Sequence, residues 1–468
     1  MTHSRRVAQH SAMTPIGKLA GLVAVLALVA ACGPTAQALH PTLAPHGNLP
    51  PGTPMFPAVP SGGAVVPTAQ VTFVPSTSQP SGAPGSASPA PAASATPQPP
   101  GIGKQITGFP VTNAFEVTGV VPIADGFLAV GYGPMPGQDI NGQRQGIVWT
   151  STDGLTWQES ADPAFANTSP FGVATLGSDI FVFVSLETCD PTVDPECDGG
   201  EATGVFKSSN GGAWEQLVQT PDIQRASFDR VVASDGLLVA WGSAGDENGT
   251  TTLWTSSDGL AWTPATDLAD MDPVNSGIAG GPGVIAFGLG IDEQGDQINM
   301  IGATSSDGVH FSAATVPSLP YGEIDDIAQG NSGFVGVGYN QTDTDPTVAL
   351  VLTSADGRTW TQAASTEASF TNAAMNQILP SANGYVAVGS VLSEDDFTDQ
   401  TTRIWTSADG QAWHLAGDVG GSYTQYDAAA LGPHGLVIFT ADQPDTGDDT
   451  QAASTINAWL ITPDRLTP

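Results

Sequence analysis

The sequence predicts an all-β protein in which residues 104–468 form a seven-bladed β-propeller of four-stranded antiparallel blades. A short turn motif, Ser-x-Asp/Asn-Gly-x-x-Trp/Phe, recurs at intervals of roughly 50 residues, a length typical of one blade. Runs of β-forming residues recur at the same places between the copies. The six copies and a degenerate seventh begin at Ser151, Ser208, Ser256, Ser305, Ser354, Ser407 and Thr462.

Each repeat is predicted to form four short strands joined by hairpins. In the sixth repeat we expect strands at 376–379, 385–389, 403–406 and from Trp413 onward. The second strand of each repeat is apolar on both faces, as expected of a strand that lies between two neighbouring sheets. The connection after this strand varies most in length, so we expect the insertions on one face of the disc.

The last repeat indicates how the ring closes. It ends soon after residues 457–461 and lacks a fourth strand. Residues 105–109 are expected to supply that strand, so that the N-terminal and C-terminal strands of the body share one blade. This arrangement would hide a sheet edge that could otherwise aggregate. The alternative is a ring of six blades with additional structure at one end of the chain.

The turn motif has a mechanical explanation. Ser and Asp side chains accept backbone N–H bonds in a tight turn, Gly takes a positive φ angle, and the aromatic ring packs between blades. The motif resembles the Asp-box, or BNR, repeat of sialidase-like propellers, whose boxes are structural and lie opposite the active site. The resemblance implies that the following residues form turns and are not catalytic: Asp153, Asn210, Asp258, Asp307, Asp356 and Asp409.

The same resemblance raises the question of sialidase chemistry. Sialidases hold a carboxylate with three arginines and use a Tyr–Glu pair and an Asp. The sequence does not bring three arginines together, and two of the six lie in or beside turn motifs. We therefore assign no catalytic residue and keep a sialidase-like glycoside hydrolase as an alternative. The six arginines of the body are Arg144, Arg225, Arg230, Arg358, Arg403 and Arg465.

Residues 1–31 are predicted to be an export signal. Basic residues precede the uncharged, mostly apolar run 19–31, which is too short to span a bilayer. The run leads into Val29-Ala30-Ala31-Cys32, which resembles the bacterial lipobox and implies cleavage before Cys32 and its lipidation. An ordinary secretory signal is the alternative. The resemblance implies an extracytoplasmic protein that is lipid-anchored to the bacterial cell membrane.

Residues 32–103 carry no charged side chain and consist mostly of Pro, Ala, Ser, Thr and Gly. Such a segment cannot bury enough apolar surface to offset the entropy of ordering, so we predict a disordered tether. Glycosylation of this tether is an open question.

The charge of the chain limits its partners. It has 46 acidic and 11 basic residues and a net charge of −35, and every acidic residue follows residue 103. This charge repels nucleic acid, which is therefore not an expected partner. Acidic clusters such as 394–396 and 445–449 leave a calcium-dependent adhesion or binding module as a further alternative. They lack EF-hand spacing, so we assign no metal site.

Two cysteines remain besides Cys32. Cys189 and Cys197 bracket a short loop with two prolines, which in an exported protein predicts a disulfide. A metal site is the alternative, but it would require further Cys or His residues nearby.

The candidate ligand face lies at the ends of the second strands, on the side of the variable connections. Tyr132, Trp241 and Tyr339 fall at such ends, and Arg225 and Arg230 are expected to enter the inner strand of the third blade. The preferred function is a lipid-anchored binding or scaffold module for a protein, peptide or glycan. We expect a monomer that needs no cofactor.

Overall fold

The computed structural model describes residues 101–468 except 112–113, 136, 138–142, 161, 188–200, 244–250, 269–270, 273–277, 282, 292–296, 342–346, 364–367, 393–399, 422–423 and 443–454. The predicted signal peptide, the lipidation site at Cys32 and the tether up to residue 100 lie outside the described residues. So do Cys189, Cys197 and the acidic clusters at 394–396 and 445–449.

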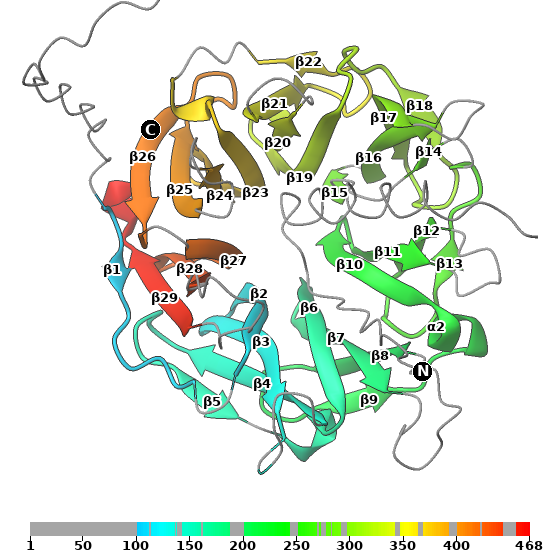
Figure 1. The fold of residues 1–468 in the computed structure, drawn as a ribbon. Coiled ribbons are helices and arrows are strands. Elements are labelled where there is room, and N and C mark those ends of the chain that lie inside the picture. Colours follow the sequence, from blue (N-terminus) through cyan, green and yellow to red (C-terminus); the bar gives the residue numbers. More distant parts are fainter. Residues whose placement is uncertain are drawn as a thin grey trace, which may run out of the picture. The chain divides into compact units, whose positions relative to one another are not determined.

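The described strands form seven antiparallel sheets arranged as blades around a common axis (Figure 1), which confirms the predicted fold class. With the inner strand first, blade 1 contains β2 (Glu116–Ile123), β3 (Gly126–Pro134), β4 (Arg144–Ser151) and β5 (Gln158–Ser160). Blade 2 contains β6 (Thr168–Leu176), β7 (Asp179–Glu187), β8 (Glu201–Ser208) and β9 (Glu215–Leu217). Blade 3 contains β10 (Ser227–Ser234), β11 (Leu237–Ser243), β12 (Thr251–Ser256) and β13 (Thr263–Pro264).

The remaining blades follow the same order, with one exception. Blade 5 contains β19 (Gly322–Gly330), β20 (Gly333–Asn340), β21 (Val348–Ser354) and β22 (Thr361–Gln362). Blade 6 contains β23 (Ala373–Ser381), β24 (Gly384–Leu392), β25 (Gln400–Ser407) and β26 (His414–Val419). In blade 4, β16 (Gly283–Ile291), β17 (Gln297–Ser305) and β18 (Ser312–Ala314) are joined by two short inner strands, β14 (Met271–Asp272) and β15 (Ile278–Gly281).

Blade 7 joins the two ends of the propeller, as predicted. Its strands are β27 (Thr424–Gly432), β28 (Gly435–Asp442), β29 (Thr455–Ile461) and β1 (Lys104–Gln105). Ile106 N also donates to the Ala458 carbonyl at 2.8 Å. The pairing is shorter than the predicted strand at 105–109. Residues 101–103, which the composition assigned to the tether, extend the body instead, since Ile102 N donates to the Asp418 carbonyl of blade 6 at 3.2 Å.

Aromatic side chains close the junction between blades 7 and 1. The Phe109 ring lies 5.4 Å from the Trp149 ring, 5.7 Å from the Trp157 ring and 5.1 Å from the Phe439 ring, measured between centroids. All four side chains are buried. The second strands β3, β24 and β28 are almost entirely buried, because each lies between two neighbouring sheets.

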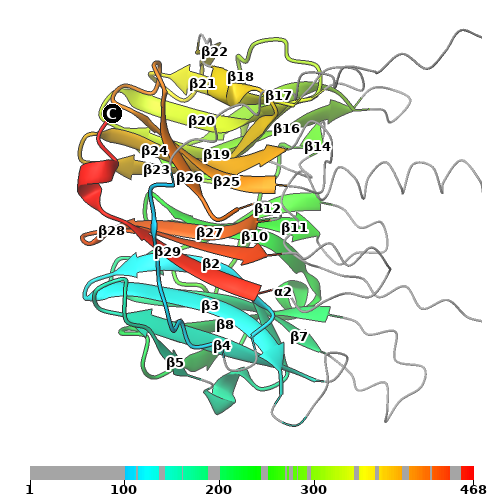
Figure 2. The same ribbon diagram turned by 60° about the vertical axis from the view of Figure 1, so that its left-hand side comes forward.

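The strand order gives the disc two distinct faces (Figure 2). Each turn motif follows the third strand of its blade, so the turn motifs share one face, called here the turn face. The second strands end at the opposite face. The helical segments are α2 (Pro221–Arg225), η1 (Pro163–Phe165), η2 (Ala368–Phe370) and η3 (Pro463–Arg465). Within the described part of the chain, none is long and apolar enough to cross a bilayer.

Candidate functional site at the propeller axis

Six inner strands carry a bulge of one residue near the face opposite the turns. The register with the second strand shifts by one residue in β2, β6, β10, β19, β23 and β27. A bulge re-aims a side chain and is common beside functional sites. The extra residues, called the bulge residues, are Thr118, Phe171, Asp229, Asp325, Asn376 and Asp427.

A glycine in the second strand makes room for four of these bulges. A Cβ atom at Gly338 would lie 2.0 Å from the Glu323 carbonyl oxygen, much closer than such atoms can approach. Gly131, Gly242 and Gly389 meet the equivalent carbonyl at 1.9–2.0 Å. These four glycines are therefore needed for close backbone approach at the bulge.

Asp325 and Asp326 form the centre of the polar cluster at the axis. They are 6% and 8% exposed, respectively. Arg230 of blade 3 donates from Nη1 to the Asp325 carbonyl and from Nη2 to Asp326 Oδ1, the latter at 2.9 Å. Asp326 Oδ2 accepts from Ile378 N of blade 6 at 2.9 Å. These contacts connect three blades through one acidic dipeptide.

Blades 6 and 7 extend this axial cluster. Asn376 Nδ2 donates to Asp325 Oδ2 at 3.4 Å, which joins two bulge residues of adjacent blades. The buried Tyr426 hydroxyl of blade 7 donates to Gln377 Oε1 of blade 6. The next residue, Asp427, has a buried Oδ2 atom that accepts no hydrogen bond from the described residues.

Glu116 and Tyr132 bring blade 1 into the cluster. The Tyr132 hydroxyl donates to Glu116 Oε2 at 3.1 Å, and the Arg144 guanidinium lies 5.0 Å above the Tyr132 ring. Arg144 Nη1 also donates to Ser169 Oγ at 3.3 Å. Glu116 is half-buried, and its negative charge contributes to the raised pKa of Asp427 in blade 7.

Burial controls the ionisation of these carboxyl groups. Desolvation raises the pKa of Asp325 well above its usual value, and the negative charge of Glu323 adds to the rise. The pKa values of Asp326 and Asp427 are also raised, mainly by burial. The positive charge of Arg230 opposes the rise at Asp325 and Asp326. The cluster therefore combines hydrogen-bond acceptors with carboxyl groups that hold their protons more tightly than usual.

A Tyr–Glu pair occurs in two blades at equivalent positions. Glu116 pairs with Tyr132 between β2 and β3, and Glu323 pairs with Tyr339 between β19 and β20. In both pairs the tyrosine hydroxyl donates to the glutamate carboxylate. Tyr339 is only 1% exposed, so its oxygen cannot reach a ligand. The repetition indicates a structural pair that positions the start of the inner strand.

The structure corrects part of the candidate ligand face. Trp241 is 3% exposed and packs in a core cluster with Leu253 and Phe311, because the second strand lies between sheets along its whole length. Tyr339 is buried for the same reason. Arg225 is exposed at the end of α2, before the inner strand begins at Ser227. Arg230 reaches the axial cluster through its contact with Asp326. Tyr132 is half-buried and contacts Glu116.

The six arginines of the body do not converge. Arg403 forms a bidentate pair with Asp418 in the outer half of blade 6, at 2.7 and 3.0 Å. Arg358 is exposed in a turn motif, and Arg465 is exposed in η3. With Arg144 at Tyr132, Arg230 at Asp326 and Arg225 on α2, no three guanidinium groups face one position. The described residues also hold no group of three His, Cys, Asp or Glu side chains that could bind a metal ion.

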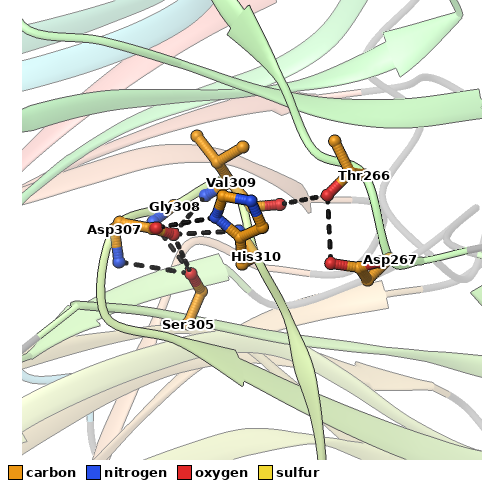
Figure 3. Close-up of polar contacts among 7 residues, drawn as sticks. All are labelled: Thr266, Asp267, Ser305, Asp307, Gly308, Val309 and His310. Atoms are coloured by element: carbon orange, nitrogen blue, oxygen red, sulfur yellow. Dashed lines mark hydrogen bonds and ion pairs between the residues drawn. The ribbon is translucent and has the colours of Figure 1, made fainter.

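The turn motifs satisfy their own polar groups. Figure 3 shows the motif of blade 4, where Ser305 Oγ accepts from Gly308 N at 2.9 Å and Asp307 Oδ1 accepts from Val309 N and His310 N at 2.9 and 2.8 Å. His310 Nδ1 lies 2.8 Å from Asp307 Oδ2. These bonds lower the pKa of Asp307 far below its usual value. The carboxylate is thus used to hold the turn.

A shallow groove of about 510 Å³ lies on the turn face between blades 5 and 6. Its lining includes Asp356, Asp409 and Gln411 of two turn motifs, and Gln411 Nε2 donates to Thr353 Oγ1 at 2.6 Å. None of the axial residues lines it. We place the candidate site at the axis, because buried polar groups from several blades meet there.

No family model matches the chain, and no curated protein matches its sequence. Among solved structures, the chain is similar to a Trypanosoma rangeli sialidase, with 12% identity and a TM-score of 0.39 over 76% of this chain and 55% of that one. The chain thus spans about half the length of that sialidase.

Two further solved structures are similar to the chain. One is the β-propeller domain of the Trilobed protease from Pyrococcus furiosus, with 7% identity and a TM-score of 0.45 over 74% of this chain and 93% of that one. The other is the phage phi92 endosialidase, with 8% identity and a TM-score of 0.41 over 77% and 69%.

Proposed function

We propose that the protein is a lipid-anchored, extracytoplasmic binding module that holds a protein, peptide or glycan partner at the axial end opposite the turn face. The observation that carries this proposal is the convergence of polar side chains from blades 1, 3, 5, 6 and 7 on the axis. Burial of polar groups costs free energy unless they are paired.

The composition of the cluster favours a partner that donates hydrogen bonds, above all a positively charged segment. The carboxyl groups near the axis include Glu116, Glu323, Asp325, Asp326 and Asp427. They outnumber the arginines among them, which are Arg230 beside Asp326 and Arg144 near Glu116. The whole chain is strongly acidic, which would steer a cationic partner toward it.

The anchoring part of the proposal rests on the sequence. The apolar run before Cys32 and the uncharged segment after it are typical of a lipoprotein with a tether. Mass spectrometry of the mature N-terminus and detergent phase partitioning would test it. A diacylated or triacylated Cys32 is expected, and Cys32→Ala should release the protein from the membrane. A mature chain that begins elsewhere would reject the anchor without affecting the binding proposal.

The glycosidase alternative has less support. The two Tyr–Glu pairs are repeated and one tyrosine is fully buried, while the arginines lie far apart in the fold. The calcium-dependent alternative depends on loops outside the described residues. It predicts a rise in melting temperature with millimolar Ca²⁺.

A binding screen tests the proposal. Peptide and glycan arrays would be probed with the chain from residue 33 onward, and the hits would be measured by calorimetry. Asp427→Asn keeps the shape of the bulge residue and should weaken binding at least tenfold. Asp464→Asn, an exposed change in η3, should leave it unchanged. Hits with equal affinity for both variants would place the site away from the axis, and an absence of hits at micromolar concentration would count against a binding module.

A further inference from the structure

Blade 4 differs from the other blades at the axis. The inner strands of the other blades are continuous and contain eight or nine residues. In blade 4, β14 has two residues and β15 has four. They pair with different halves of β16, since Met271 stands opposite Gly290 and Ile278 stands opposite Ala286. The ring therefore has fewer inner-strand ladder bonds here than in any other blade of the described structure.

Arg230 spans this blade. It extends from β10 of blade 3 to β19 of blade 5, where it donates to the Asp325 carbonyl and to Asp326 Oδ1. The other hydrogen bonds that join blades in the axial cluster connect adjacent blades, as in Asn376 to Asp325 and Tyr426 to Gln377. The Arg230 contact passes over one blade, and it does so at the blade whose inner strand is divided.

We infer that Arg230 and the Asp325–Asp326 dipeptide form a clamp that joins blades 3 and 5 directly and keeps the ring closed at blade 4. The planar guanidinium group suits this role because it can donate to a carbonyl and a carboxylate at once. Asp326 also links the clamp to blade 6, because its Oδ2 atom accepts from Ile378 N. The clamp thus fixes the inner strands of blades 3, 5 and 6 on the side of the ring where blade 4 contributes least.

The burial of the partners is consistent with this role. The Asp326 side chain is 11% exposed, whereas the Arg230 side chain is 35% exposed. The carboxylate is therefore shielded on the blade 5 side and the guanidinium approaches from the more open side. Loss of the arginine would leave Asp326 with its backbone N–H partner but without its counter-charge, which is costly for a buried carboxylate.

Hydrogen–deuterium exchange of the chain from residue 33 onward tests the clamp. We expect Arg230→Gln to increase exchange at least tenfold in β15, β16 and β19, with little change in β3 and β24. Arg403→Gln is the matched control, because it removes a bidentate arginine–carboxylate pair within blade 6. It should increase exchange in β25 and β26 and leave β16 unchanged.

Two outcomes would overturn the inference. Exchange in β16 that is the same in Arg230→Gln and the unmutated protein would show that blade 4 needs no clamp. An increase spread evenly over all seven blades would show a general loss of stability. If Arg230→Gln does not fold, Arg230→Lys provides the same measurement, since a lysine keeps the charge but lacks the planar fork that aligns both bonds. It should give an intermediate increase confined to the same strands, and an unchanged or uniform profile would reject the clamp.

Discussion

The Asn376 side-chain amide donates to the Asp325 carboxyl group across the boundary between blades 5 and 6, at 3.4 Å. Both are the extra residues of bulged inner strands, so the repeat that builds each blade also builds the axial cluster. The same backbone irregularity thus presents a different side chain in each blade. This explains how seven similar blades can together place different polar side chains at the axis.

Asp325→Asn should stabilise the protein at neutral and alkaline pH. Burial raises the pKa of Asp325, so its contribution to stability is present below the pKa of the unfolded chain and is lost as the pH rises through the folded-state pKa. Asparagine cannot ionise and can still accept from Asn376. We expect a gain on the order of 1 kcal/mol at pH 8 and less at pH 4, measured as melting temperature against pH. A lower melting temperature at pH 8 would contradict this explanation.

Gly338→Ala should be strongly destabilising. Its Cβ atom would lie 2.0 Å from the Glu323 carbonyl oxygen, so the bulge of β19 would have to move. We expect a loss of about 2–3 kcal/mol or more in urea unfolding. Gly336→Ala is the control in the same strand, because the nearest atom to its Cβ would be the side-chain atom Ile324 Cγ2 at 3.3 Å, with no backbone atom in the way. Equal losses for the two variants would show that the bulge does not need this glycine.

The fold could be predicted because its signals are local. A turn motif of seven residues carries the serine, the acidic residue, the glycine and the ring that form each turn, and the spacing of the copies gives the blade length. The closing strand could be predicted from the missing strand of the last repeat. Only its length was wrong, since regular pairing ends at Gln105.

The axial cluster could not be predicted in the same way. Asp325, Asn376 and Asp427 lie in strands where the bulge interrupts the alternation of the two faces, so the sequence pattern does not show that they point to the axis. The prediction placed Tyr339 and Trp241 on an exposed face because it took the second strands to end at the surface, whereas neighbouring sheets cover these side chains. The available signal was the Val-Gly pair inside three second strands, at Gly131, Gly338 and Gly389, because each of these glycines lies opposite a bulge.

Gly308→Ala should measure the packing between blades 3 and 4. Gly308 has a φ angle of +74°, and its Cβ atom would lie 2.4 Å from Thr255 Cγ2 of the neighbouring blade. Gly177→Ala is the matched control, with a φ angle of +64° and no atom within 4 Å of the new Cβ. We expect about 1 kcal/mol of destabilisation for Gly177→Ala from the backbone angle alone. Gly308→Ala should cost a further ~1–3 kcal/mol from the clash. Similar values for both would indicate that the turn can shift away from Thr255.

His310 should titrate above the usual pH range of histidine, and Asp307 should be the cause. The Asp307 carboxylate lies 2.8 Å from His310 Nδ1, and its hydrogen bond and charge raise the pKa of the imidazole. The charged pair is complete below the pKa of a free histidine, and its contribution to the turn is lost as the pH rises through the raised pKa.

Proton NMR of the imidazole signals would give the titration curve of His310. In Asp307→Asn the His310 curve should move to lower pH, because the hydrogen bond and the charge that raise its pKa are removed. Because both His310 and Asp307 are exposed, the shift should shrink as salt is added. A His310 curve that is the same with and without the carboxylate would show that the pair does not form in solution.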